Sequence, residues 1–229
     1  ANANFGTFVA VNNPDPDWIT GWGKRTYNWQ TSVGIDRELL PGLMVSAGYF
    51  RTWYGNFTVT DNLAVAPEDY SPFSITAPVD PRLPGGGGYT VSGLYDLAPA
   101  KVGQVDNLVR RSSDFGKKAT HTNNFFTVSL NTRFGSDIRF GGGIDTGRSV
   151  VDNCFVVDSP QLLNCRVVTS FKNQTQVKLF GSYPLPAGFL VSAIVNNVVG
   201  APILANYTVT RAQIEAVLRD MRNQFVDEV

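Results

Sequence analysis

The chain of 229 residues is long enough for one large domain, and only 17% of it is charged, against roughly 25% in ordinary globular domains. Its 19 Lys and Arg residues balance its 19 Asp and Glu residues, which argues against nucleic acid as a partner. No run approaches the roughly 18 apolar residues of a membrane helix, and no signal peptide is visible.

Asp15 and Asp17 stand in the first polar loop, "NNPDPD", beside two asparagines. Carboxylate and amide oxygens are calcium ligands, but the ligand spacing and the bidentate glutamate of a regular calcium loop are missing. Calcium at Asp15 and Asp17 is therefore a minor candidate. We expect no other cofactor and no metal site.

Residues 27–55 have the pattern of a β-hairpin. Apolar and polar side chains alternate up to a turn at Pro41 and Gly42, and they alternate again behind it. The apolar positions on both sides of the turn are odd-numbered, as at Val33 and Val45, so we expect them on one face of a sheet.

Two further hairpins, at residues 124–148 and 175–197, repeat this design. Their apolar residues also keep one parity across the turn, so all three hairpins predict strands with one apolar and one polar face. The spacing between the turns and the aromatic residues predicts strands of about ten residues, close to the length of a membrane strand.

Long connections, at residues 55–123 and 149–173, separate the hairpins. The short turns then lie at one end of the sheet and the long loops at the other, which is typical of outer-membrane barrels and rare in compact soluble domains. Cys154 and Cys165 fall in the second connection. Their spacing favours a small disulfide loop and an oxidising compartment, with two unpaired buried thiols as the alternative.

Four charged residues of the three hairpins fall on the face opposite the apolar one. They are Asp36, Arg139, Asp145 and Lys178. In a barrel these side chains line the lumen and set ion or substrate preference, whereas in a soluble sandwich they form a solvated face.

Bulky aromatic residues gather at the ends of the first hairpin that lie away from its turn. They are Tyr27, Trp29, Tyr49, Trp53 and Tyr54. Tryptophan and tyrosine at a fixed distance from a turn match the aromatic girdle that borders an apolar membrane band, and this favours the barrel interpretation.

No residue is assigned a catalytic role. His121 is the only histidine, no G-x-S-x-G motif is present, and an exposed loop position explains His121 well. We therefore lean against an enzyme.

Residues from about 211 to 225 predict an amphipathic helix. Thr210 and Gln213 form a capping-box pattern, and the apolar residues behind them share one helical face. We expect this helix to pack on a partner surface or a neighbouring element, with binding to a membrane surface as the alternative.

Three strings carry a resemblance to a known family: "GWGKRTYNWQTSVGIDRELLPGLMVSAGYFRTWYGNFTVTDN", "TAPVDPRLPGGGGYTVSGLYD" and "TQVKLFGSYPLPAGFLVSAIVNNVVGAPILANYTVT". From about residue 4 to about residue 214 the chain resembles the late barrel region of TonB-dependent receptor-like outer-membrane proteins. The resemblance is to the large members with a carboxypeptidase-regulatory-like domain. It implies a Gram-negative outer-membrane barrel that binds or imports an unidentified small ligand.

These observations predict an all-β fold, an antiparallel meander of hairpins that is either a barrel segment or a β-sheet or sandwich, plus the short C-terminal helix. We expect one domain over residues 1–229 and a fragment of a larger barrel, because such transporters have about 22 strands. The expected partners are the outer-membrane bilayer, the small ligand, and the remainder of the barrel or other copies. The alternatives are a soluble secreted binding module or hydrolase, and a structural subunit that assembles through open strand edges.

Overall fold

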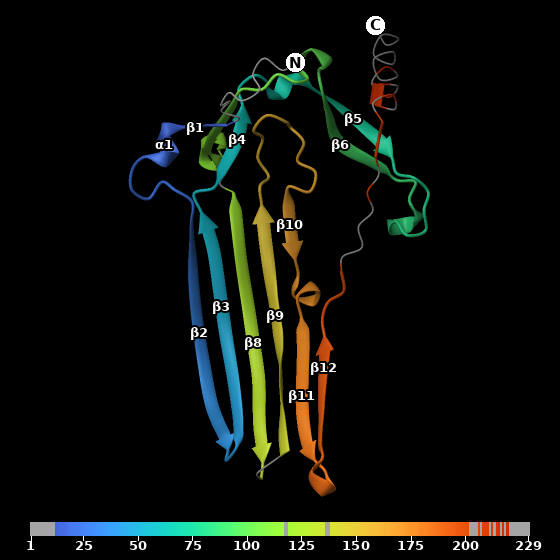
Figure 1. Ribbon diagram of the computed structural model, residues 1–229. Coiled ribbons are helices and arrows are strands. Elements are labelled where there is room, and N and C mark those ends of the chain that lie inside the picture. Colours follow the sequence, from blue (N-terminus) through green and yellow to red (C-terminus); the bar gives the residue numbers. More distant parts are fainter. Residues whose placement is uncertain are drawn as a thin grey trace, which may run out of the picture.

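The computed structural model describes residues 12–116, 119–135, 138–201, 206, 208–210, 212, 214, 215, 217 and 219. The fold is all-β, as predicted: long antiparallel strands form one sheet, and smaller sheets lie beyond one end of it (Figure 1). No helix in the described part of the chain is long and apolar enough to cross a membrane.

The main sheet has the strand order β12-β11-β9-β8-β3-β2, and β10 pairs with β9 beside this path. All of these pairings are antiparallel. The bounds are β2 (Tyr27–Leu40), β3 (Leu43–Gly55), β8 (Thr120–Phe134), β9 (Ile138–Asp152), β10 (Arg166–Thr169), β11 (Gln176–Pro184) and β12 (Leu190–Asn197).

Four of these strands are longer than the ten residues that we expected. β2 has 14 residues, β3 has 13, and β8 and β9 have 15 each. In β8 and β9 the extra length lies at the end away from the turns, where polar residues such as Asn123 and Asn124 still pair in the ladder. A ladder of hydrogen bonds needs only backbone N–H and C=O groups. The pattern of apolar side chains therefore underestimated the length of the strands.

The three short turns lie at one end of the sheet, and the long connections rise from the other, at the top of Figure 1. Gly42, with φ of 80°, makes the β2–β3 turn, and a Cβ there would lie 2.7 Å from the carbonyl oxygen of Arg133. The N–H of Gly42 also donates to Oε1 of Glu38 at 2.9 Å. Glycine is therefore required at this turn by both conformation and space.

The long connections and the segment before β2 contain a second set of elements, which we call the loop layer. β4 pairs antiparallel with β7, β1 pairs parallel with β7, and β5 and β6 form a separate hairpin. The bounds are β1 (Asn13–Pro14), α1 (Pro16–Ile19), β4 (Thr58–Asn62), β5 (Tyr70–Thr76), β6 (Thr90–Leu97) and β7 (Asn107–Arg111). Single 3₁₀ turns join the strands, at η1 (Pro67–Asp69), η2 (Pro84–Gly86), η3 (Pro99–Lys101), η4 (Ser112–Phe115), η5 (Phe171–Asn173) and η6 (Pro186–Gly188).

The few buried side chains lie mostly in or beside the loop layer. Among the described residues, the buried hydrophobic ones are Phe73, Ala77 and Ala119, and Asp61 and Ser112 are buried polar ones. The long strands contain one such side chain, Thr132. The main sheet is therefore a single layer without a core of its own.

The helix expected at residues 211–225 lies largely outside the described residues. The described positions within it, among them Ile214 and Val217, have helical backbone. The amphipathic helix as a whole stays a prediction.

Candidate functional site

The pairing register places the apolar residues of all three hairpins on one face of the sheet, as predicted. Val33 pairs with Tyr49, Tyr49 with Phe126, Val128 with Ile144, and Ile144 with Val177. We call this side the apolar face: the odd-numbered residues of β2, β3, β11 and β12 and the even-numbered residues of β8 and β9.

The apolar face is open over its whole width. Val33 is 67% exposed, Val128 53% and Ile144 49%, although these side chains lie in the middle of long strands. Within the described residues the long strands contact mainly their sheet neighbours. Monomeric soluble proteins rarely expose contiguous apolar patches of this extent.

Aromatic side chains border the apolar face at both ends. Trp29 pairs directly with Trp53 at the loop end, and Tyr27 lies one step further along β2. At the turn end the same face has further aromatic residues, which the sequence predicted on the apolar face but not as part of the girdle: Phe134, Phe140 and Tyr183. Their signal was available, because they continue the same period-two series.

Two of the five predicted girdle residues lie elsewhere. Tyr49 is deeper in the sheet, where its ring lies 4.9 Å from that of Phe126 and its hydroxyl donates to Oδ1 of Asn124 at 2.8 Å. Tyr54 pairs with Asn28 and His121 on the opposite face, and its ring stacks on His121 at 4.4 Å. Trp53 and Tyr54 are sequence neighbours in a strand, so they cannot share a face.

One row of the apolar face is polar. Thr31 pairs with Arg51, Arg51 with Asn124, and Asn124 with Arg148. This row lies between the Tyr49–Phe126 pair and the Trp29–Trp53 pair. The sequence analysis missed it, although Arg51 visibly interrupts an otherwise apolar series of odd-numbered residues.

The four predicted residues of the polar face are on that face but do not form one cluster. Nζ of Lys178 lies 3.8 Å from Oδ2 of Asp145, so these two form an exposed ion pair. Asp36 is in the edge strand β2, opposite Ser46. Arg139 is near the turns, opposite Arg133 and Ser182.

Two phenylalanines lie across glycines on the polar face. Phe125 pairs with Gly147 and Phe180 with Gly141, and each ring occupies the space in which a glycine Cβ would sit. A ring that covers a glycine lies flat on the sheet. These side chains therefore project little from the polar face despite their size.

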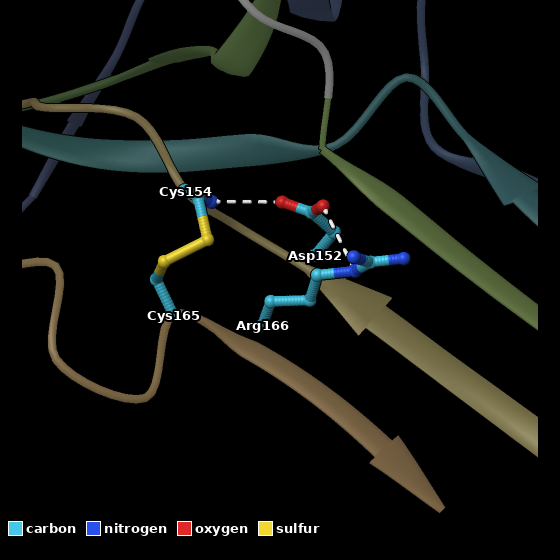
Figure 2. Close-up of a disulfide and its surroundings, with 4 residues drawn as sticks. All are labelled: Asp152, Cys154, Cys165 and Arg166. Atoms are coloured by element: carbon cyan, nitrogen blue, oxygen red, sulfur yellow. Dashed lines mark hydrogen bonds and ion pairs between the residues drawn. A yellow bond between two sulfur atoms is a disulfide. The ribbon is translucent and has the colours of Figure 1, made fainter.

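The predicted disulfide is present and closes a loop of the loop layer (Figure 2). The Cα atoms of Cys154 and Cys165 lie 4.8 Å apart. Asp152 braces the base of this loop, because it accepts from the N–H of Cys154 at 3.1 Å and lies 3.5 Å from Nε of Arg166. The residues between the cysteines are called the disulfide loop below.

The disulfide loop docks on two strands of the loop layer. Oδ1 of Asp158 accepts from the N–H of Asn62 in β4 at 3.0 Å, and Oε1 of Gln161 accepts from the N–H of Tyr95 in β6 at 3.3 Å. Burial raises the pKa of the Asp158 carboxyl, the Asn62 N–H lowers it, and the neighbouring Asp61 carboxyl raises it. Asp158 is thus a carboxyl for which ionisation is costly.

Asp61 is held by an arginine from the neighbouring strand. Nη1 of Arg110 lies 2.9 Å from Oδ2 of Asp61, and this bond raises the pKa of Arg110. Asp61 is 8% exposed. The ion pair therefore compensates the desolvation of a buried carboxylate.

A polar pocket of 350 Å³ lies where the main sheet meets the loop layer. Lys24 and Arg111 line it, Nη2 of Arg111 lies 3.5 Å from Oδ1 of Asp114 outside the lining, and the described lining residues include neither Asp nor Glu. Tyr27 and Tyr54 form part of its wall. This composition suits a small polar or anionic molecule.

Asp15, the first of the two candidate calcium ligands, caps α1, and its Oδ1 accepts from the N–H of Asp17 at 2.8 Å. No group of three or more His, Cys, Asp or Glu residues that could hold a metal ion is found among the described residues. The calcium site stays a minor prediction.

Comparison with models of protein families, with curated proteins and with solved structures finds no match to this chain.

Proposed function

We propose that the chain is a segment of an outer-membrane barrel of the TonB-dependent receptor-like kind, with its apolar face toward lipid and its polar face toward the lumen. The observation that supports this most is a single-layer sheet whose uncovered apolar face is bordered by aromatic side chains at both ends. Lipid is the partner that such a face fits.

The height of the apolar face agrees with this proposal. From Leu43 to Trp53, β3 advances ten residues, or about 33 Å along the strand. At the tilt of about 35–45° that membrane strands adopt, this corresponds to a height of about 25 Å, the thickness of the apolar band of outer-membrane barrels.

Ligand binding belongs to the polar side in this proposal. The polar pocket beside Lys24 and Arg111 lies at the loop end, where a molecule from outside arrives first. Further along the polar face, the same molecule would contact the Asp145–Lys178 pair and Arg139. The ligand class that fits these groups is a small polar molecule taken up in a Gram-negative bacterium.

The sheet needs strands from elsewhere to span a bilayer. β2 and β12 are its edges, and within the described residues neither pairs with a further strand. Unpaired backbone groups are not tolerated in hydrocarbon, so both edges require partners. We propose that the remainder of the barrel supplies them.

The open edges also favour a second candidate, a subunit that assembles with other copies. The edge of β2 offers 14 exposed residues for strand pairing. The soluble-sandwich alternative has less support, since it requires a second sheet on the apolar face and the described residues place none there.

Single-cysteine labelling tests the proposal. Val128→Cys and Ile144→Cys place an environment-sensitive dye on the apolar face, and Ser129→Cys and Asp145→Cys place it on the polar face. In vesicles, brominated lipid should quench the first pair strongly and the second pair weakly. Equal quenching of all four, or a monodisperse chain without detergent, would contradict the membrane assignment. Ordered rings or fibres would favour the subunit candidate.

A further inference from the structure

We propose that the row of Arg51, Asn124 and Arg148 on the apolar face binds the phosphate of an anionic lipid headgroup. This inference rests on the proposed membrane function and adds a specific ligand to the lipid-facing side, apart from any ligand of the polar face.

The two arginines are placed to share one phosphate. Arg51 and Arg148 flank Asn124 on three adjacent strands, so their Cα atoms are about 10 Å apart. Both side chains are exposed. Two arginine side chains reach across this separation, and their fork of N–H donors matches phosphate oxygens.

Asn124 supplies a further donor. Its Oδ1 accepts from the Tyr49 hydroxyl at 2.8 Å, which fixes the amide and leaves its NH₂ group to donate. The row therefore presents N–H donors from three side chains, and its amide oxygen, Oδ1 of Asn124, is already occupied by the Tyr49 hydroxyl.

The positive charge of the row has no carboxylate partner among the described residues. Arg51 and Arg148 form no ion pair among the described residues. The main strands place one carboxylate on the apolar face, Asp152, and it lies two rows away beside Arg166. Two unneutralised cations on an apolar surface call for an anion from outside the chain.

The row also lies just inside the border of the apolar band, within reach of the lipid headgroups. It is one row from the Trp29–Trp53 pair, which marks the border of the apolar band. The guanidinium of Arg51 lies over the Trp53 ring, 5.5 Å from its centroid, so the side chain extends from the row toward the loop end. Long cationic side chains at a membrane border extend to the headgroups in this way.

A lipid-binding experiment tests the inference in two stages. First, the chain is added to vesicles of phosphatidylcholine alone, which tests whether it inserts into a membrane that contains no anionic lipid. Second, the chain in zwitterionic micelles is titrated with dansyl-labelled phosphatidylglycerol, and binding is followed by energy transfer from tryptophan. We expect Arg51→Gln combined with Arg148→Gln to weaken phosphatidylglycerol binding about 25-fold, or about fivefold for each arginine.

Matched variants make the result specific. Arg82→Gln combined with Arg133→Gln removes the same two charges from the loop layer and from the polar face, and it should bind like the parent chain. Arg51→Lys combined with Arg148→Lys keeps the charge and should recover part of the affinity. Inorganic phosphate should compete weakly, because it lacks the acyl chains.

The outcomes separate this inference from the membrane assignment. A chain that enters no vesicle sinks both. A chain that enters phosphatidylcholine vesicles, but binds phosphatidylglycerol equally with and without the two arginines, keeps the membrane assignment and overturns the headgroup site. Full competition by inorganic phosphate would overturn the lipid as ligand and leave a free-anion site.

Discussion

The main sheet and the loop layer bury their side chains in different ways. The loop layer has buried residues such as Phe73 and Asp61, several ion pairs and the disulfide. The main sheet contains two ion pairs among the described residues, Lys178–Asp145 and Arg166–Asp152, and its long strands leave large apolar side chains open. The loop layer is thus organised as proteins in water are, whereas the sheet depends on whatever covers its apolar face.

This difference explains how the two regions are stabilised. Between its two open edges the sheet pairs its backbone groups in long ladders, as strands in hydrocarbon must. The loop layer has short strands, and it compensates with ion pairs and a covalent link that closes a loop. Substitutions whose cost in stability differs between the apolar face of the sheet and the loop layer test this difference.

The largest effect is expected from a charge in the middle of the apolar face. Val128→Arg should destabilise the chain in lipid by about 2–4 kcal/mol, because the guanidinium enters the hydrocarbon. Its neighbour on the other face gives the control, since Ser129→Arg should cost about 1 kcal/mol or less. The measurement is urea unfolding from vesicles, followed by tryptophan fluorescence. Equal costs would break the comparison, since Val128 is 53% exposed and in water its replacement is nearly neutral.

The disulfide should stabilise the loop layer alone. Replacing Cys154 and Cys165 by Ala removes the closure of a short loop. From the chain entropy that this closure removes in the unfolded state, we expect the free energy of unfolding to fall by up to about 3 kcal/mol. Hydrogen exchange measured by mass spectrometry should speed up in the disulfide loop and in β4, which the loop contacts through Asn62. Unchanged exchange in β8 is the internal control. Faster exchange throughout the sheet would show that the two regions are not independent.

A smaller effect is expected from breaking the ion pair of Asp61. Arg110→Gln leaves the Asp61 carboxylate, at 8% exposure, without its guanidinium and should cost the loop layer about 1–3 kcal/mol. Arg82→Gln breaks the solvent-exposed pair with Asp80 and should leave local stability almost unchanged. Local protease resistance measures both. Similar losses would mean that burial does not decide the value of these pairs.

The main sheet was predictable because its signal is local. Alternation at Phe126, Val128 and Leu130 determines which side chains share a face, and an odd turn transfers that parity to the next strand. The same rule would have placed Tyr54 opposite Trp53 and would have revealed the polar row at Arg51. Both signals were in the sequence and were missed.

The loop layer was not predictable in this way. β4 pairs with β7, about fifty residues later in the chain, and β1 pairs in parallel with β7. No turn motif announces pairings between distant segments, since they depend on tertiary contacts. The contacts of Asp158 and Gln161 likewise follow from how the disulfide loop docks, whereas the pairing of Cys154 with Cys165 followed from spacing.

The smallest effect is expected at Asp158, and its direction depends on pH. Since the pKa of this carboxyl is raised in the folded state, the stability that its protonated form contributes is complete at low pH and is lost as pH rises through the folded-state pKa. Asp158→Asn keeps an acceptor for the Asn62 N–H and puts an amide beside Asp61 in place of a second carboxylate.

At neutral pH this substitution should strengthen docking of the disulfide loop by less than about 1 kcal/mol, and at acidic pH the gain should vanish. Hydrogen exchange of Asn62 and its β4 neighbours, compared between the two pH values after correction for intrinsic rates, measures it. Asp158→Ala separates the two effects, because it relieves the carboxyl pair but loses the acceptor. A gain from Asp158→Asn that is equal at both pH values would show that the Asp61–Asp158 pair is not what opposes docking.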